Sequence, residues 1–312
     1  MKVMKPMLPS LVTEIPEGLD WVYEVKYDGF RAIIYIDETK VTIMSRNQNV
    51  LNEQFPEIVE GFIAYQKSLQ APIIFDGELC VIENDYKANF DKIQIRGRLK
   101  NSEKIEDAKK TTPVTFMAFD VLMENGEWLT HRPYEERKKR LEDTVKNIQE
   151  DKPFLRYVPY YKDPQKLWSK ISQVFGEGII AKRRQSLWQE GKRTNQWVKI
   201  KNLMIASFFI LGYDEANSFF HIGCLYKGDI KLIGKVGQGF TKEEKEALVA
   251  IIKKNAEKTV QNLICVKPSI CIEVEFLEVS KNELRHPKFR RFRFDKNWEE
   301  CTWEAIPKLG QN

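Results

Sequence analysis

The sequence lacks the features that define several large protein classes. No apolar run in its 312 residues approaches the ~20 that a membrane-spanning helix needs, and residues 1–14 contain no apolar core of a secretory signal. Its five cysteines form no Cys-x-x-Cys pair, which argues against a zinc ribbon and gives no support to a disulfide framework. Its three histidines show no metal-ligand spacing. We therefore expect a cytoplasmic protein that does not span a membrane.

The sequence also has little net charge and no internal repeat. Fifty Lys and Arg residues face 45 Asp and Glu residues, so the net charge of +5 permits a polyanionic partner without requiring one. Cations gather locally instead. Residues 285–294 interleave arginine and lysine with phenylalanine, which fits a half-buried strand whose charged side is either simply solvated or also contacts phosphates. Lys138-Lys139-Arg140 is interpreted as the solvated face of a helix.

The pattern of expected strands and helices changes near residues 201–203. Before this point strands are expected at 21–26, 30–36, 41–44 and 114–122, and helices at 52–66, 134–145 and 164–175. Residues 101–112 are charged and rich in structure breakers, which predicts a mobile loop. After it come short strands at 207–213, 219–226, 230–236 and 269–279 and one helix at 242–254, a pattern that suits a small β-barrel such as an OB-fold.

Lys26 is the first candidate for chemistry. It stands in Glu24-Val25-Lys26-Tyr27-Asp28-Gly29-Phe30-Arg31, at the end of an expected strand and before a glycine turn. Such a setting fixes the lysine stem and lets a ligand approach the backbone, as in-line attack on an α-phosphate requires. Taken alone, the run fits a surface lysine before a hairpin turn at least as well.

Further candidate residues follow in or beside other expected strands: Arg46, Glu78, Phe119, Glu177, Lys199 and Lys201. Carboxylates bind Mg²⁺, and lysine and arginine stabilise the charge on phosphate oxygens in a transition state. A ring of cations should also lower the pKa of a lysine among them and leave more neutral amine to attack. Phe119 suits stacking on a purine, although a core aromatic is the alternative, and solvated strand-end carboxylates are the alternative for Glu78 and Glu177.

The order of these motifs, from about residue 21 to 296, resembles the covalent nucleotidyltransferase superfamily of ATP-dependent DNA ligases, RNA ligases and mRNA capping enzymes. Pro6-Met7-Leu8 and residues 21–29 are most similar to bacterial DNA ligases of the non-homologous end-joining type. The resemblance implies an α+β fold. An ATP-grasp-like nucleotidyltransferase domain of antiparallel sheets and helices would span residues 1–202, and the OB-fold domain would span residues 203–312.

The resemblance also implies a role for each matching residue, with Lys26 forming the covalent lysyl-AMP. It implies nucleotide contacts for Glu24, Arg31, Arg46, Glu78, Phe119, Arg193, Lys199 and Lys201. Metal binding is implied for Glu78 and Glu177. Contacts to nucleic acid or to the departing pyrophosphate are expected of Arg290, Arg291, Arg293 and Lys296.

The function expected on these grounds is that of an ATP-dependent DNA ligase. With Mg²⁺ or Mn²⁺ it would seal 5′-phosphate/3′-hydroxyl nicks through lysyl-AMP and DNA-adenylate, as a monomer. The resemblance also implies a role in non-homologous end joining together with the end-binding protein Ku. It further implies that the ligase is fused to polymerase or nuclease domains. An RNA ligase, a capping guanylyltransferase and a non-catalytic nucleic-acid-binding module are the alternatives. An NAD-dependent ligase is disfavoured because the zinc-binding cysteines of that family are missing.

Overall fold

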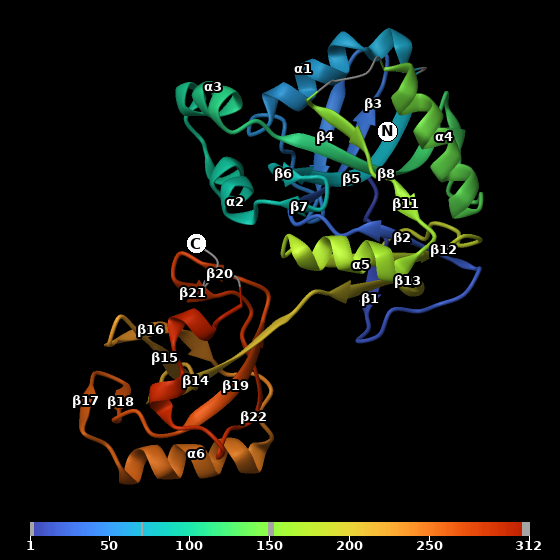
Figure 1. The fold of residues 1–312 in the computed structure, drawn as a ribbon. Coiled ribbons are helices and arrows are strands. Elements are labelled where there is room, and N and C mark those ends of the chain that lie inside the picture. Colours follow the sequence, from blue (N-terminus) through green and yellow to red (C-terminus); the bar gives the residue numbers. More distant parts are fainter. Residues whose placement is uncertain (1–2, 70, 149–152, 308–312) are drawn as a thin grey trace. The chain divides into compact units, whose positions relative to one another are not determined.

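The computed structural model describes residues 3–69, 71–148 and 153–307 and divides the chain into two compact units, Met1–Asn202 and Leu203–Asn312 (Figure 1). Two sheets form the frame of the first unit. Sheet A has the order β1-β13-β12-β2-β11. Its strands are β1 (Leu8–Leu11), β13 (Arg193–Lys201), β12 (Gly178–Arg183), β2 (Trp21–Val25) and β11 (Tyr160–Tyr161). Within the described ranges, no helix is long and apolar enough to cross a membrane.

Sheet B has the order β10-β8-β5-β3-β4, with β9 paired to β8. Its strands are β10 (Leu155–Tyr157), β8 (Thr115–Glu124), β5 (Ile73–Cys80), β3 (Phe30–Ile36), β4 (Val41–Ser45) and β9 (Glu127–Trp128). A separate small hairpin joins β6 (Ile82–Asn84) to β7 (Lys87–Ala88). Most pairs are antiparallel as expected, but β1 pairs with β13, and β10 with β8, in parallel. Both parallel partners come from distant parts of the chain, so no hairpin dictates their direction.

Five α-helices and one short 3₁₀-helix belong to the described part of this unit. They are α1 (Pro56–Ala64), α2 (Phe90–Arg98), α3 (Ser102–Thr111), α4 (Tyr134–Asn147), α5 (Pro164–Gln173) and η1 (Gln66–Ser68). The loop predicted at 101–112 is wrong, because this segment forms α3. The Asn101 side chain accepts a hydrogen bond from the backbone of Lys104 and caps the helix, and buried Ile105 anchors it.

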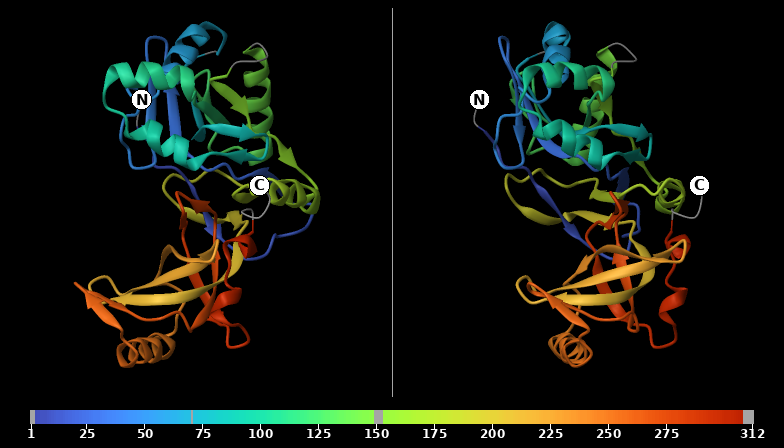
Figure 2. Two further views of the ribbon diagram at one scale, coloured as in Figure 1. Left: turned by 60° about the vertical axis from the view of Figure 1, so that its left-hand side comes forward. Right: turned by 90° about the vertical axis from the view of Figure 1, so that its left-hand side faces the viewer.

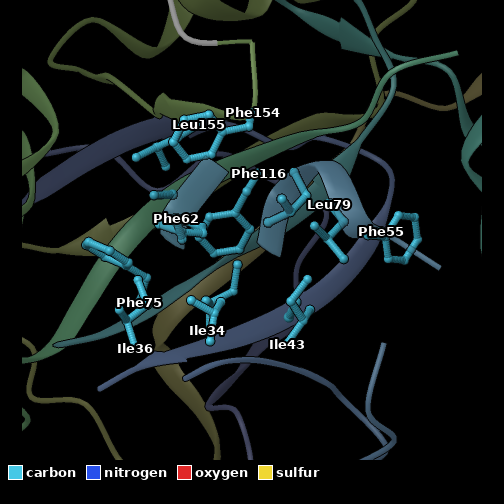
Figure 3. Packing of buried hydrophobic residues seen from close by; sticks show 14 of the residues in the cluster. Ile34, Ile36, Ile43, Phe55, Phe62, Phe75, Leu79, Phe116, Phe154 and Leu155 are labelled. Atoms are coloured by element: carbon cyan, nitrogen blue, oxygen red, sulfur yellow. The ribbon is translucent and has the colours of Figure 1, made fainter. Parts of the chain in front are cut away.

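The layers of the first unit follow from the alternation of side chains along the strands. Residues such as Val22 and Trp197 of sheet A pack against Ile33 of sheet B, so the two sheets lie face to face. On the outer side of sheet B, the ring of Phe62 from α1 lies 5.2 Å from that of Phe154 and 5.9 Å from that of Phe75 (Figure 3). Helix α5 covers the opposite face of sheet A. Each buried aromatic of this kind contributes about 1.5–3 kcal/mol.

The second unit is built on one antiparallel sheet that curls round as a half-barrel (Figure 2), in keeping with the expected OB-fold. Its strands are β14 (Met204–Asp214), β15 (Phe219–Tyr226), β16 (Asp229–Val236), β17 (Lys258–Val260), β18 (Leu263–Cys265), β19 (Cys271–Phe276) and β22 (Lys288–Phe292). The hairpin β20 (Val279–Ser280) and β21 (Glu283–Leu284), helix α6 (Lys242–Lys254) and the 3₁₀-helices η2 (Trp298–Glu300) and η3 (Trp303–Ala305) complete it. The predicted helix 242–254 is confirmed, with a capping box between Thr241 and Glu244.

Candidate active site

Most of the residues singled out in the first unit line one cavity of about 180 Å³. They are Glu24, Lys26, Arg31, Arg46, Glu78, Phe119, Arg193 and Lys199. They come from β2, β3, β5, β8 and β13 and from the segments that follow β2 and β4, so both sheets contribute to the walls. Groups that are scattered along the sequence therefore line one common cavity.

The position of Lys26 follows from the local sequence. Glu24 and Lys26 are two residues apart and face the cavity, while Tyr23 and Val25 pack against α5 on the other side. The turn that follows needs its glycine. A Cβ on Gly29 would lie 2.1 Å from the carbonyl oxygen of Leu79, so only glycine lets β3 approach β5 here.

The Lys26 amine is paired with a carboxylate. Its Nζ lies 2.5 Å from Oε2 of Glu177, a residue implied as a metal ligand. Burial lowers the pKa of Lys26, but the charges of Glu177, Asp28 and Glu78 outweigh burial and leave the pKa raised above its ordinary value. The expected lowering of this pKa by surrounding cations is therefore wrong for the free protein, because the nearby acids raise it by more than burial lowers it.

Glu78 is a buried carboxyl whose pKa is raised to about 8. Burial is the main cause, with further raising by Glu177 and Asp28, while Lys26 and Arg31 act in the opposite direction. Such a group gains from a divalent cation, and the described residues contain no cluster of three or more His, Cys, Asp or Glu side chains that would hold one alone. Two carboxylates fit Mg²⁺ when substrate phosphates and water complete its shell.

Arg31 is held by a bidentate ion pair with Asp76, at 2.6 and 2.7 Å. Its guanidinium carbon lies 4.3 Å from the centre of the Phe119 ring. Asp76 also accepts from the indole nitrogen of Trp188 at 3.1 Å. Asp76, which carried no predicted role, thus fixes the arginine against the aromatic wall of the cavity.

Glu24 lies in a charge cluster that the sequence analysis did not anticipate. Its Oε1 accepts from the Tyr134 hydroxyl and from Lys138 Nζ at 2.6 Å, and its Oε2 pairs with Lys182 Nζ at 2.6 Å. The interpretation of Lys138 as solvated is wrong, since its side chain is 1% exposed. The helical spacing was the available signal: Tyr134, Lys138 and Leu141 share one face of α4, and all three are buried.

The cations that are expected to contact phosphates differ in their surroundings. Burial and the charges of Lys26, Lys201 and Arg193 lower the pKa of Lys199. Lys201 lies two residues further along β13 and is not part of the cavity lining. Arg193 donates to the backbone carbonyl of Pro9 at 2.7 Å. Arg46 and Leu8 line both this cavity and a neighbouring one of about 400 Å³ that also includes Lys5, Pro6, Asn47, Gln48 and Gly191.

Three of the four basic residues singled out in the second unit, Arg290, Arg291 and Arg293, pair with carboxylates of the same unit. On β22, Arg291 forms two hydrogen bonds with Glu273, at 3.0 and 3.1 Å. Arg293 pairs with Asp295 at 2.7 Å and reaches Glu273 at 3.3 Å, and Arg290 lies 4.0 Å from Glu275. These arginines remain near the surface, so their charges are oriented and only partly neutralised.

Two family models match the chain. The ATP dependent DNA ligase domain covers residues 6–201, and the ATP dependent DNA ligase C terminal region covers residues 215–296. The chain belongs to the ATP-dependent DNA ligase family. Its nucleotidyltransferase ligase fold with a C-terminal OB-type half-barrel agrees with that assignment.

Individual ligases support the same assignment. The bifunctional non-homologous end joining protein LigD of Bacillus subtilis is 35% identical over 96% of this chain, which corresponds to 51% of that protein. A DNA ligase of Thermococcus fumicolans is 27% identical over 99% of the chain and 59% of its own length. The crystal structure of the ligase domain of M. tuberculosis LigD is 25% identical with a TM-score of 0.55, covering 96% of this chain and 98% of that one. The chain thus spans about half the length of these curated relatives.

Proposed function

We propose that the chain seals nicks between a 5′-phosphate and a 3′-hydroxyl in double-stranded DNA at the expense of ATP. The observation that carries the proposal is the cavity in which Lys26 lies among three arginines, Lys199 and Glu78. Residues 1–202 would form the adenylation domain and residues 203–312 the OB-fold domain, since the chain passes from the first compact unit to the second between Asn202 and Leu203.

In the first step, Lys26 Nζ attacks the α-phosphorus of ATP. A P–N bond forms, the bond to the β-phosphate oxygen breaks, and pyrophosphate leaves. The amine must lose a proton before it attacks, and Glu177 Oε2 at 2.5 Å is placed to accept it. Lys199 and Arg193 supply positive charge for the phosphate oxygens. The AMP then passes to the 5′-phosphate of DNA, and the 3′-hydroxyl displaces it.

The acidic side of the cavity would hold the metal. Glu78 and Glu177 are hard oxygen donors whose charges both act on Lys26. When bound, Mg²⁺ or Mn²⁺ would neutralise phosphate charge. The base would lie toward Glu24 and Phe119, with the 6-amino group of adenine donating to the carboxylate of Glu24. Arg31 would act mainly by holding the wall of the cavity through Asp76.

The DNA would be reached through the cavity that shares Arg46, while Arg290, Arg291, Arg293 and Lys296 would contact phosphates or orient pyrophosphate. A role in non-homologous end joining is supported by the similarity to a LigD that is named a bifunctional non-homologous end joining protein. Ku and polymerase or nuclease domains would be its partners in that role. We place the enzyme in the cytoplasm, on DNA, acting as a monomer.

The test is covalent labelling with ATP or GTP that carries radioactive phosphorus in the α-phosphate, in the presence of Mg²⁺ or Mn²⁺. We expect label from ATP that Lys26→Ala abolishes, followed by sealing of nicked DNA in preference to nicked RNA. Label from GTP would favour a capping enzyme, and better sealing of RNA would favour an RNA ligase. A folded protein that takes no label from either nucleotide would refute the proposal and leave a non-catalytic DNA-binding module.

A further inference from the structure

Lys138 is a buried cation that lies outside the lining of the active-site cavity. Its side chain is 1% exposed, and its ammonium donates to Glu24 Oε1 at 2.6 Å and to the backbone carbonyl of Phe119 at 3.2 Å. The ring of Tyr157 lies 4.6 Å away. Glu24 and Phe119, the two residues that Lys138 contacts through hydrogen bonds, both line the cavity. Lys138 therefore contacts the wall of the site from behind.

Stability alone gives little reason for this arrangement. Burying a charged pair costs several kcal/mol of desolvation per ion, and well-packed apolar residues of similar volume often do as well or better. Here two ammonium groups, Lys138 and Lys182, share the single carboxylate of Glu24. The cluster therefore buries one cation more than Glu24 neutralises, which points to a requirement on the position of that carboxylate.

The two oxygens of Glu24 face different surroundings. Oε1 is taken up by Lys138 and the hydroxyl of Tyr134, both buried on α4 and outside the lining. Oε2 pairs with Lys182, which lines the cavity. A carboxylate oxygen accepts about two hydrogen bonds. Fixing Oε1 from behind thus stops the carboxylate from rotating and keeps an acceptor site on the cavity side.

We propose that Lys138, supported by Tyr134, is a positioning residue that orients Glu24 and thereby sets the preference of the adenylation step for ATP over GTP. The inference rests on the proposed contact between Glu24 and the base. A fixed acceptor suits the 6-amino group of adenine, which donates, and repels the 6-oxo group of guanine, which accepts. Without Lys138, only the Tyr134 hydroxyl holds Oε1, so the carboxylate of Glu24 can rotate and its acceptor no longer keeps a fixed direction in the cavity.

The experiment measures single-turnover labelling of the full chain across ATP and GTP concentrations. In Lys138→Met we expect the ATP:GTP ratio of kcat/KM to fall about tenfold, the size of one lost charge-assisted hydrogen bond. The loss should appear in the KM for ATP, with the maximal rate kept within a few-fold, because Lys138 does not touch Lys26. Tyr134→Phe keeps the ring and should shift the ratio in the same direction by less.

Two controls separate positioning from general damage. Arg96→Met removes a cation of equal burial, 1% exposed and paired with Glu57 at 2.6 Å, and should leave the ratio unchanged. In a Glu24→Gln background, Lys138→Met should add nothing to the ratio, since it acts through Glu24.

The outcomes are distinguishable. If Glu24→Gln alone leaves the ATP:GTP ratio unchanged, the proposed contact of Glu24 with the base fails, and this inference fails with it. If Glu24→Gln lowers the ratio but Lys138→Met and Tyr134→Phe keep the wild-type value, Glu24 retains its role and the positioning role of Lys138 is overturned. A Lys138→Met effect that persists in the Glu24→Gln background also overturns it. Should Lys138→Met fail to fold, Tyr134→Phe carries the test.

Discussion

Loss of Arg137 should destabilise the first unit strongly, because Arg137 and Asp120 form an ion pair in which both side chains are 0% exposed. Arg137 donates to the two oxygens of Asp120 at 2.9 and 2.7 Å, and to the carbonyls of Arg132 at 2.6 Å and Ser186 at 3.1 Å. Removing one member of such a pair leaves a buried charge without its partner, which costs about 3–5 kcal/mol. We expect a loss of this size in Arg137→Met.

A matched control lies three residues away on the same helix. Arg140 is 39% exposed and reaches Glu124 at 3.4 Å and Glu127 at 3.1 Å, so Arg140→Met should cost about 0–1 kcal/mol. Both variants can be followed by urea unfolding with tryptophan fluorescence, fitting the transition of the first unit separately from the second. Adding Asp120→Asn to Arg137→Met should restore part of the loss. Equal, small losses in Arg137→Met and Arg140→Met would show that the buried pair does not act as described.

Three further predictions concern the change of stability with pH, the glycine turn at Gly29 and the binding of nicked DNA. The pKa of Glu78, raised to about 8 in the folded protein, means that folded Glu78 holds a proton that the unfolded chain releases, so stability should fall as pH rises from about 5 to 8. Glu78→Gln should flatten that slope in metal-free unfolding measurements, and an unchanged slope would contradict the assignment. Gly29→Ala should cost about 1–3 kcal/mol and slow adenylation, because the new Cβ meets the carbonyl of Leu79; unaltered stability by thermal unfolding would contradict this. Arg291→Ala should weaken binding of nicked DNA and reduce the slope of log K against log salt by about 1, whereas an unchanged slope would remove Arg291 from the DNA contacts.

The candidate residues for chemistry could be selected from the sequence because each stands in a short motif. Lys26 before Gly29 and Glu78 after Gly77 are placed by local turn and strand geometry, and the structure brings both to one cavity. The fold class could be predicted for a similar reason, since strand alternation and the short strands after residue 203 are local patterns.

The features of the site that the sequence does not predict depend on contacts between residues that are distant along the chain. Glu24 and Lys138 are 114 residues apart, and nothing near either one reveals the pair. The run Lys138-Lys139-Arg140 predicts a solvated face because charged residues are mostly exposed, but helix periodicity puts Lys138 on the inner face and leaves Lys139 outside. The predicted direction of the pKa shift of Lys26 is wrong for the same reason. Its direction depends on the closest charge, and only the folded chain shows that this charge belongs to Glu177.

The ion pair between Lys26 and Glu177 has a consequence for the resting enzyme. Reactive small molecules in a cell, such as aldehydes and acyl phosphates, modify unprotonated amines and spare ammonium groups. A nucleophile stored in its charged form against an acid is therefore protected from accidental modification during the intervals between substrates. The same contact would thereby lengthen the working life of a protein that depends on this one lysine.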